Sequence, residues 1–336
     1  MFRSPGPSAF RVLAPVCVLL SGLVSGCAGT PAVTHVELPK ELPTELKDKF
    51  EVKETSTLAQ TPVQPENKIE VKPQKGKSRK RKRKGAPATA AFEFPNRRPA
   101  QDPIWVGEKE VYEIAYFGMA AGDFTTETLP YQAVNNRKVY HIRATAVSSS
   151  VFSIFYRLND TVETFIDYEG LFSHRFHLIL DESKQSRDAL ELNDSEKAQT
   201  FYWNKWFHVE RGYTETKEYA PIPAFSQDSL SSLYYLRTVP LKDGDVFTFP
   251  VVSEGKYFEA VITVVRHEPM DTVMGRVQTV VLKPDTRFQG VLQKRGDSYI
   301  WLTDDDRRVV VRLEAKVKIG TVTARMKNFV PGMAPQ

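Results

Sequence analysis

The stretch VVVRLEAKVKIG, residues 309–320, constrains the fold more than any other part of the sequence. Every second residue from Val309 to Ile319 is apolar, and the residues between them are charged from Arg312 onward. An alternation with a period of two over this length predicts a half-buried antiparallel strand. After Gly320 the phase shifts by one residue, which predicts a β-bulge or a sharp bend. A sheet bent at such a point would curl.

Similar alternating segments fill the chain from Trp105 onward, and turn-forming pairs such as Asn135-Asn136 separate many of them. Further strands are predicted at residues 109–117, 123–129, 138–147, 160–167, 172–180, 187–193, 199–204, 207–212, 245–252, 256–267, 276–283, 288–293 and 298–303. Apolar residues at helical spacing predict two short helices, within residues 150–158 and 226–239.

The segments do not show the regular exchange of strands and helices that a parallel sheet requires. We therefore expect an all-β domain over residues 101–330. Its antiparallel, curled sheet would form a β-roll or an incompletely closed barrel, with one or two short helices.

The N-terminus has the pattern of an export signal. Arg3 and Arg11 precede an apolar run at residues 12–24, which is too short to span a bilayer comfortably. The following VSGC resembles the lipobox of bacterial lipoproteins. The resemblance implies a signal peptide at residues 1–26 and a diacylglycerol on Cys27. The alternative is an ordinary secretory signal that happens to contain a cysteine.

The residue after Cys27 is Ala28 rather than aspartate. In the common Gram-negative sorting pattern, the absence of aspartate at this position implies transfer to the outer membrane. The sequence leaves the face of that membrane open, and we expect the periplasmic one. The acyl chains would supply most of the anchoring, at about 0.8 kcal/mol for each buried CH₂ group.

Residues 27–100 are rich in proline, have no long apolar periodicity and are predicted to form a disordered tether. Residues 28–100 contain 16 Lys and Arg against 9 Asp and Glu. A helical turn within 41–53 is conceivable, but Pro43 and the scarcity of apolar residues argue against a stable one.

The tether contains the run KGKSRKRKRKG, which begins at Lys75. Its basic residues are Lys75, Lys77, Arg79, Lys80, Arg81, Lys82, Arg83 and Lys84. In an exported chain, their acidic partners would be anionic lipid, lipopolysaccharide or cell-wall polymer. The alternative is a solvated charge run that keeps a linker extended. Residues 101–336 contain 28 Lys and Arg against 32 Asp and Glu, so nucleic-acid binding by the domain is not expected.

Four segments, at residues 107–128, 139–176, 227–251 and 299–326, resemble in the same order the bacterial exported proteins grouped as Domain of Unknown Function family 3108. The resemblance covers about residues 105–328. It implies an antiparallel β-rich domain behind a signal sequence. It implies no established activity and supplies no catalytic residues, and the basic run lies outside it.

No catalytic, cofactor or metal signature stands out. His174 and His177 would lie on opposite faces of a strand, and the G-x-S-x-G elbow of a serine hydrolase is absent. The aromatic residues would mostly fill the core. The alternative is a ligand groove with an arginine to fix an anionic head group. Its candidate residues are Tyr116, Arg157, Tyr234, Tyr235, Arg237 and Trp301.

Three functions remain open. The first is a non-enzymatic lipoprotein, anchored in the outer membrane, that binds or scaffolds a glycan, lipid or protein of the cell envelope. The second is a carrier of lipid or lipoprotein, in which the curled sheet encloses an acyl chain. The third is an enzyme that modifies envelope glycan, which predicts converging carboxylates in a polar cleft.

Overall fold

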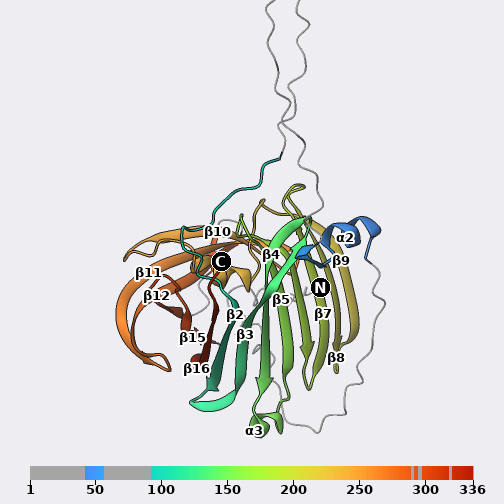
Figure 1. The fold of residues 1–336 in the computed structure, drawn as a ribbon. Helices are drawn as coiled ribbons and strands as arrows, with labels where there is room; N and C mark the ends of the chain where they lie inside the picture. The colour runs from blue at the N-terminus through green and yellow to red at the C-terminus, as the bar shows by residue number, and fades with distance from the viewer. Residues whose placement is uncertain (1–41, 57–91, 289–290, 294–296, 318–319, 336) are drawn as a thin grey trace, which may run out of the picture.

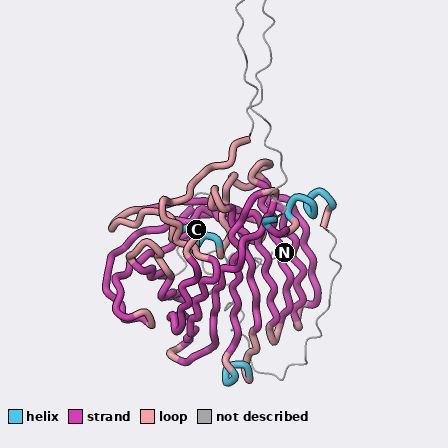
Figure 2. Tube along the Cα trace, in the orientation of Figure 1, coloured by secondary structure: helices cyan, strands magenta, loops and turns pink. Residues whose placement is uncertain are grey.

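The computed structural model describes residues 42–56, 92–288, 291–293, 297–317 and 320–335. It confirms the all-β fold class, because nearly all regular structure belongs to one antiparallel sheet (Figures 1 and 2). Among the described residues, no helix is both long and apolar enough to cross a bilayer.

The sheet begins as a continuous meander of eight strands. These are β2 (Val106–Tyr116), β3 (Met119–Val134), β4 (Arg137–Ser148), β5 (Asn159–Asp167), β6 (Ser173–Asp181), β7 (Gln185–Asp194), β8 (Gln199–His208) and β9 (Gly212–Pro221). The short helix α3 (Ser150–Ser153) lies between β4 and β5, and α4 (Ser231–Leu236) follows β9.

The second half of the sheet returns to the first. Its strands are β10 (Val246–Ser253), β11 (Lys256–Thr272), β12 (Gly275–Phe288), β13 (Val291–Gln293), β14 (Ser298–Thr303), β15 (Val310–Lys316) and β16 (Thr321–Met333). The last strand, β16, pairs with the first strand of the meander, β2. The strand order therefore runs from β10 through β16 and β2 to β9.

The sheet is curled and not closed, because β9 and β10 end its two sides and do not pair with each other in the described part of the chain. The turn between β10 and β11 nevertheless reaches the meander. Gly255 N donates a hydrogen bond to Glu191 Oε1 at 2.8 Å. Arg187 Nη2 lies 2.9 Å from Glu254 Oε1. The main core fills the concave side, where side chains such as Tyr140, Leu302 and Val281 are buried.

A second, smaller core lies on the other face of the meander. Val139 belongs to it, whereas the next residue in β4, Tyr140, belongs to the main core. Helix α2 (Thr44–Phe50) covers this face with the buried side chains of Leu46 and Phe50. The adjacent β1 (Lys53–Glu54) pairs with β3.

Residues 44–54 are thus ordered against the domain, contrary to the prediction of a disordered tether throughout 27–100. Leu46 and Phe50 lie one helical turn apart, and their burial compensates for the weak intrinsic propensity of the segment. Lys49 Nζ also lies 2.9 Å from Asp194 Oδ2. The basic run at residues 75–84 falls outside the described residues. In the sequence it lies between β1 and the described segment that begins at Phe92.

The structure corrects three further local predictions. Gly320, with φ of 84°, lies in the hairpin turn between β15 and β16, so the phase shift marks a reversal of the chain and not a bulge. Predicted strands 199–204 and 207–212 are mostly one strand, β8, and β9 was missed. The helix expected within 150–158 is only four residues long.

Candidate functional site

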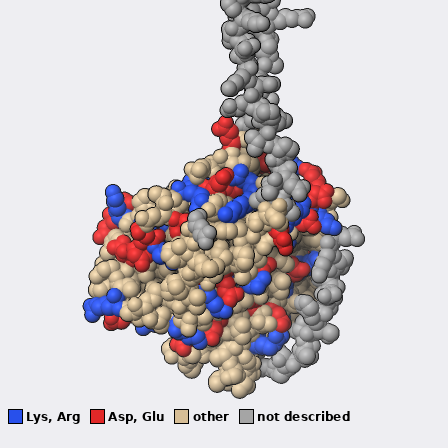
Figure 3. All heavy atoms as spheres, in the orientation of Figure 1, with Lys and Arg blue, Asp and Glu red and all other residues tan. Residues whose placement is uncertain are grey.

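Two neighbouring loops at one end of the sheet expose a group of large apolar side chains, which we call the apolar apex. It consists of Phe117, Met119, Val151, Ile154 and Phe155, which are 59–79% exposed. The first two belong to the β2–β3 hairpin and the others to α3 and the residue pair after it. This end is the lower one in Figure 1, and Figure 3 shows mostly uncharged atoms there. Single exposed apolar residues are common, but a cluster at one end marks a contact surface.

The β2–β3 hairpin holds Phe117 outward. Phe117 and Gly118 both have positive φ, at 51° and 74°, as a tight hairpin turn requires. The ring of Tyr116 lies 4.4 Å from that of Phe117, measured between centroids. On the other side, a Cβ atom added to Gly320 would come within 2.9 Å of the Phe117 ring. The β15–β16 turn therefore packs directly against this part of the apex.

Hydrogen bonds fix the loop that carries α3. Ser149 N donates to Ala121 O at 2.8 Å, and Ser149 Oγ accepts from Phe152 N at 3.2 Å as the N-cap of the helix. Ser153 Oγ donates to Ser149 O at 2.7 Å. The loop is joined to β3 and capped, so Val151, Ile154 and Phe155 are held in water by a defined backbone.

Arg157 lies at the border of the apex and is exposed. Its guanidinium forms a two-pronged pair with the carboxylate of Asp181, at 2.7 and 2.8 Å. The pairing raises the pKa of Arg157. Arg157 is therefore the one arginine of the predicted groove that stands next to an accessible apolar surface.

The other predicted arginine, Arg237, is unavailable to a ligand, which corrects the groove hypothesis at this position. Its side chain is 2% exposed and pairs with Glu108, with Nη2 2.9 Å from Oε2. Nη2 also donates to Pro103 O at 2.7 Å, and Nε to Arg307 O at 3.1 Å. Burial opposes ionisation of Glu108, but the Arg237 charge holds its pKa below the ordinary value.

The remaining groove candidates belong to the main core. Tyr234 is buried, and Tyr235 packs edge-on against Phe249 with centroids 5.1 Å apart. Trp301 is buried as well, and its Nε1 donates to Glu268 Oε1 at 2.7 Å. Only Tyr116 adjoins the apex, through Phe117. The simpler expectation, that these aromatic residues pack the core, describes Tyr234, Tyr235 and Trp301.

Among the buried carboxyl groups, Glu110, Asp160 and Glu191 have pKa values far above the ordinary range. Burial, and then the charge of Glu108, raise the pKa of Glu110 well above its ordinary value. Burial and the neighbouring Glu182 raise the pKa of Asp160 to about 8. Burial also raises the pKa of Glu191 to about 8. Such groups gather at active sites, but these three are fixed in separate internal networks on β2, β5 and β7.

His174 and His177 both contact carboxylates of the same domain. His174 is buried with Nε2 2.9 Å from Asp167 Oδ2, whereas His177 Nε2 lies 2.8 Å from Asp188 Oδ1. Within the residues that the structure describes, no group of three or more His, Cys, Asp or Glu side chains is placed to hold a metal ion.

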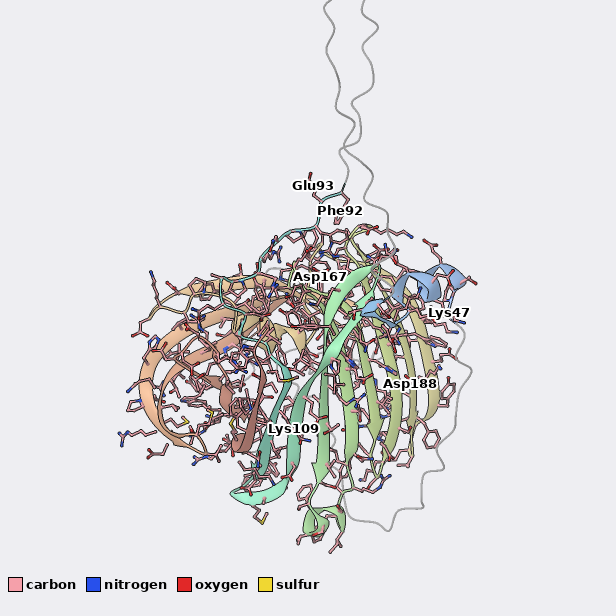
Figure 4. The ribbon with its side chains drawn as sticks, in the orientation of Figure 1. Lys47, Phe92, Glu93, Lys109, Asp167 and Asp188 are labelled. Carbon is pink, nitrogen blue, oxygen red and sulfur yellow. The ribbon has the colours of Figure 1, made fainter. Side chains whose placement is uncertain are left out.

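The end of the sheet opposite the apex receives the N-terminal segments. Figure 4 shows Lys47 of α2 and the labelled Phe92 and Glu93 at this upper end. Arg97 N donates to Glu169 O at 2.8 Å in the β5–β6 turn, and the Phe94 ring stacks on that of Phe172 with centroids 6.0 Å apart. Cys27 and the eight basic residues at 75–84 lie outside the described residues. The described segments nearest the basic run in the sequence, β1 and the stretch that begins at Phe92, lie toward this end.

The apex was not predicted from the sequence, although a signal was present. The helical spacing of the apolar residues within 150–158 predicted a short helix and gave no indication that they would be exposed. Their neighbours are serines at 148, 149, 150 and 153, which cap and turn the chain instead of continuing a helix.

Comparison with known proteins identifies the family but no activity. A family model described as a protein of unknown function, DUF3108, matches residues 111–327. No curated protein matches the chain.

Among solved structures, a β-barrel-like protein of the DUF1849 family from Brucella abortus has 10% identity and a TM-score of 0.44, covering 67% of this chain and 98% of that one. A candidate exported protein with a YmcC-like fold from Bacteroides fragilis has 9% identity and a TM-score of 0.31, over 72% of this chain and all of its own. A candidate lipoprotein from Parabacteroides distasonis has 7% identity and a TM-score of 0.30, covering 71% of this chain and 100% of that one. Since the family model matches well over half of this chain, the chain belongs to the DUF3108 family of proteins of unknown function.

Proposed function

We propose that this protein is a non-enzymatic scaffold of the cell envelope, acylated at Cys27 and anchored in the outer membrane on its periplasmic side. Its apolar apex contacts membrane lipid, and its basic run contacts an anionic cell-wall polymer. The observation that carries the proposal is the apex, where five large apolar side chains are held in water at the tips of two fixed loops.

The chemistry of the apex favours lipid as its partner. Its side chains protrude from loop tips, so they suit insertion into a fluid acyl layer. Moving an aliphatic or aromatic side chain fully from water to an apolar environment contributes about 1.5–3 kcal/mol. Arg157 at the border matches the position in which arginine meets head-group phosphates.

The length of the N-terminal segment permits this orientation. About 17 residues separate Cys27 from the start of α2, and at most 3.3–3.6 Å per residue gives a reach of roughly 55–60 Å. A ten-residue strand such as β7 is about 33 Å long. An acylated Cys27 can therefore lie in the same membrane as the apex while α2 remains docked at the far end.

The same orientation lets the basic run face away from the membrane. The described residues that flank the run, at β1 and from Phe92 onward, lie toward the end opposite the apex. Among the expected partners, an anionic wall polymer lies on that side of the domain, whereas lipid head groups lie at the apex. The protein would then connect the membrane with the wall.

Vesicle flotation tests the contact between apex and lipid. A chain with Cys27→Ser removes the acyl anchor, so that weak binding by the domain becomes measurable. Ile154→Ser with Phe155→Ser in this background should lower the partition coefficient into phosphatidylcholine vesicles, which carry no net charge for the basic run to bind, about a hundredfold, from the transfer energies of two side chains.

The matched control is Val246→Ser with Val273→Ser, which removes two exposed apolar side chains on the other half of the sheet. Binding should be retained in this control. Equal binding by the apex variant and its parent would refute lipid contact through the apex.

The carrier and enzyme alternatives gain less support. The concave face is lined by a contiguous cluster of buried apolar side chains, which occupies the place of an enclosed acyl chain. The perturbed carboxyl groups are buried in separate networks, whereas a glycan-modifying enzyme needs two that face a cleft.

A further inference from the structure

Strand β9 ends one side of the sheet and contributes almost nothing to the core. It pairs with β8 over all ten residues without a register shift. All of its residues except Ala220 are exposed, on both faces. A long, regular edge strand presents unpaired N–H and C=O groups along its free side. No backbone group in the described segments of the chain pairs with that free side.

The opposite edge of the sheet, β10, is protected. Gln227 N donates to Pro250 O at 2.9 Å, and Val252 N donates to Gln227 O at 2.7 Å. Pro250 itself removes one donor from the edge. Within the described segments, the chain thus covers part of the β10 edge and leaves the β9 edge open.

The sequence of β9, GYTETKEYAP, is self-complementary about Thr216. When the strand is turned end to end about Thr216, Glu215 takes the position of Lys217, and Tyr213 takes the position of Tyr219. These four side chains share one face, because they lie at alternate positions. Contacts within the face hold them: Tyr213 Oη donates to Glu215 Oε2 at 3.1 Å, and Lys217 Nζ lies 3.0 Å from Glu215 Oε1.

The registers of self-pairing that join seven or more residues of β9 centre on residues 215 to 218. Only one of them avoids charge repulsion at its centre. In an antiparallel ladder, every second residue directs its N–H and C=O groups to the free edge. Two copies related by a twofold axis can therefore pair only in registers in which one residue lies opposite the same residue of the second copy. Centring on Glu215, Lys217 or Glu218 places like charges opposite each other. Centring on Thr216 places Glu215 opposite Lys217 of the second copy, twice, with a tyrosine pair on either side. Opposite charges and aromatic pairs across strands are favourable.

We propose that β9 pairs antiparallel with β9 of a second copy of this chain, centred on Thr216. The two sheets become one continuous sheet across a twofold axis, with the same surface used by both copies. Edge pairing buries less area than a standard interface, so the dimer is weak in dilute solution. Anchoring in a common membrane would raise the local concentration of the partner strand.

Disulfide trapping of the purified full chain in detergent tests the register. Thr216→Cys places two thiols directly opposite each other, within the separation that a disulfide requires. Mild oxidation should give a covalent dimer on a non-reducing gel. Thr214→Cys is the matched control, because its two copies would lie about 14 Å apart along the strands. Its dimer yield should be at least tenfold lower.

A mixture provides a second register test. Thr214 would lie opposite Glu218 of the second copy. Chains with Thr214→Cys and chains with Glu218→Cys should therefore cross-link when mixed, and neither should do so alone.

Charge exchange tests the pairing in the Thr216→Cys background. Adding Lys217→Glu should reduce the dimer at least tenfold, and adding Glu215→Lys to that variant should restore it. These side chains are exposed, so folding should be unaffected, as circular dichroism would verify. A Thr216→Cys yield no higher than that of Thr214→Cys would overturn the proposal. So would a Thr216→Cys monomer whose introduced thiol resists alkylation, because another segment of the same chain would then cover the edge.

Discussion

Arg237 and Arg157 show how burial decides what a charged residue does in this fold. Arg237 bonds Glu108, Pro103 O and Arg307 O in the interior, whereas Arg157 pairs with Asp181 at the surface. A buried pair is costly to break, because the remaining charge is left without a partner. Both arginines looked equally available in the sequence, because the partners of Arg237 come from segments more than 60 residues away.

Replacing Arg237 should therefore destabilise the protein far more than replacing Arg157. We expect Arg237→Ala to lower the free energy of unfolding by about 3–5 kcal/mol. Arg157→Ala should cost less than about 1 kcal/mol, because solvent screens its pair. Urea denaturation measures both, and a similar loss for the two variants would refute the assignment of Arg237 to an internal network.

Glu191 should make stability fall as pH rises. Burial raises its pKa to about 8, above the ordinary glutamate value of about 4.3. The folded chain therefore binds this proton more tightly than the unfolded chain, so the stabilisation is present below about pH 4 and is lost progressively towards pH 8.

Glu191→Gln should remove that loss while keeping an oxygen acceptor for Gly255 N. The wild-type urea midpoint should fall more between pH 5 and pH 8 than that of the variant. The exposed Glu113→Gln is the control and should follow the wild type. An identical pH dependence in all three proteins would show that Glu191 does not hold the proton.

At the scale of elements, periodicity predicted the strands that have one buried face. Leu313, Ala315, Val322, Ala324 and Met326 are all buried, as the alternation indicated. Two of the elements that were missed, α2 and β9, lack such a signal. Strand β9 exists because β8 supplies its hydrogen-bond partners, and α2 exists because the outer face of the meander receives Leu46 and Phe50. Tertiary contacts of this kind leave no local pattern.

Helix α2 should undock when its buried aromatic side chain is removed. Phe50→Ala deletes a side chain that is fully buried in the outer core, at a cost of about 3–5 kcal/mol. Hydrogen exchange should show faster exchange at α2 and β1, with the central strands unchanged. Lys47→Ala, at an exposed position of the same helix, should leave exchange unaltered. Loss of protection throughout the sheet would mean that α2 is part of the main folding unit.

At the scale of the whole molecule, the two ends of the curled sheet have different proposed partners. The fold class, the order of segments and the resemblance to the family could be predicted from the sequence. The difference between the two ends of the domain could not be predicted from the sequence, because it depends on which turns meet at each end. Only the pairing of β16 with β2 brings the turn at Gly320 next to Phe117.

The basic run should affect contact with polymer and leave anchoring unchanged. Replacing the Lys and Arg residues of 75–84 with Ser should not alter membrane fractionation, because the acyl chains supply most of the anchoring energy. Retention on anionic wall polymer at low salt should fall, since such contacts are electrostatic and screened by salt. Release of this variant from the membrane would contradict the assignment of the anchor to Cys27.

The orientation of the acylated protein on vesicles tests the proposed lipid contact of the apex most directly. Spin labels on Ile154→Cys at the apex and on Lys47→Cys in α2 report whether each site meets oxygen dissolved in lipid or a nickel chelate dissolved in water. We predict that the label at 154 is accessible to oxygen and shielded from the chelate, whereas the label at 47 is open to the chelate. Equal access of the chelate to both labels, or a lipid environment at 47, would contradict the proposed orientation.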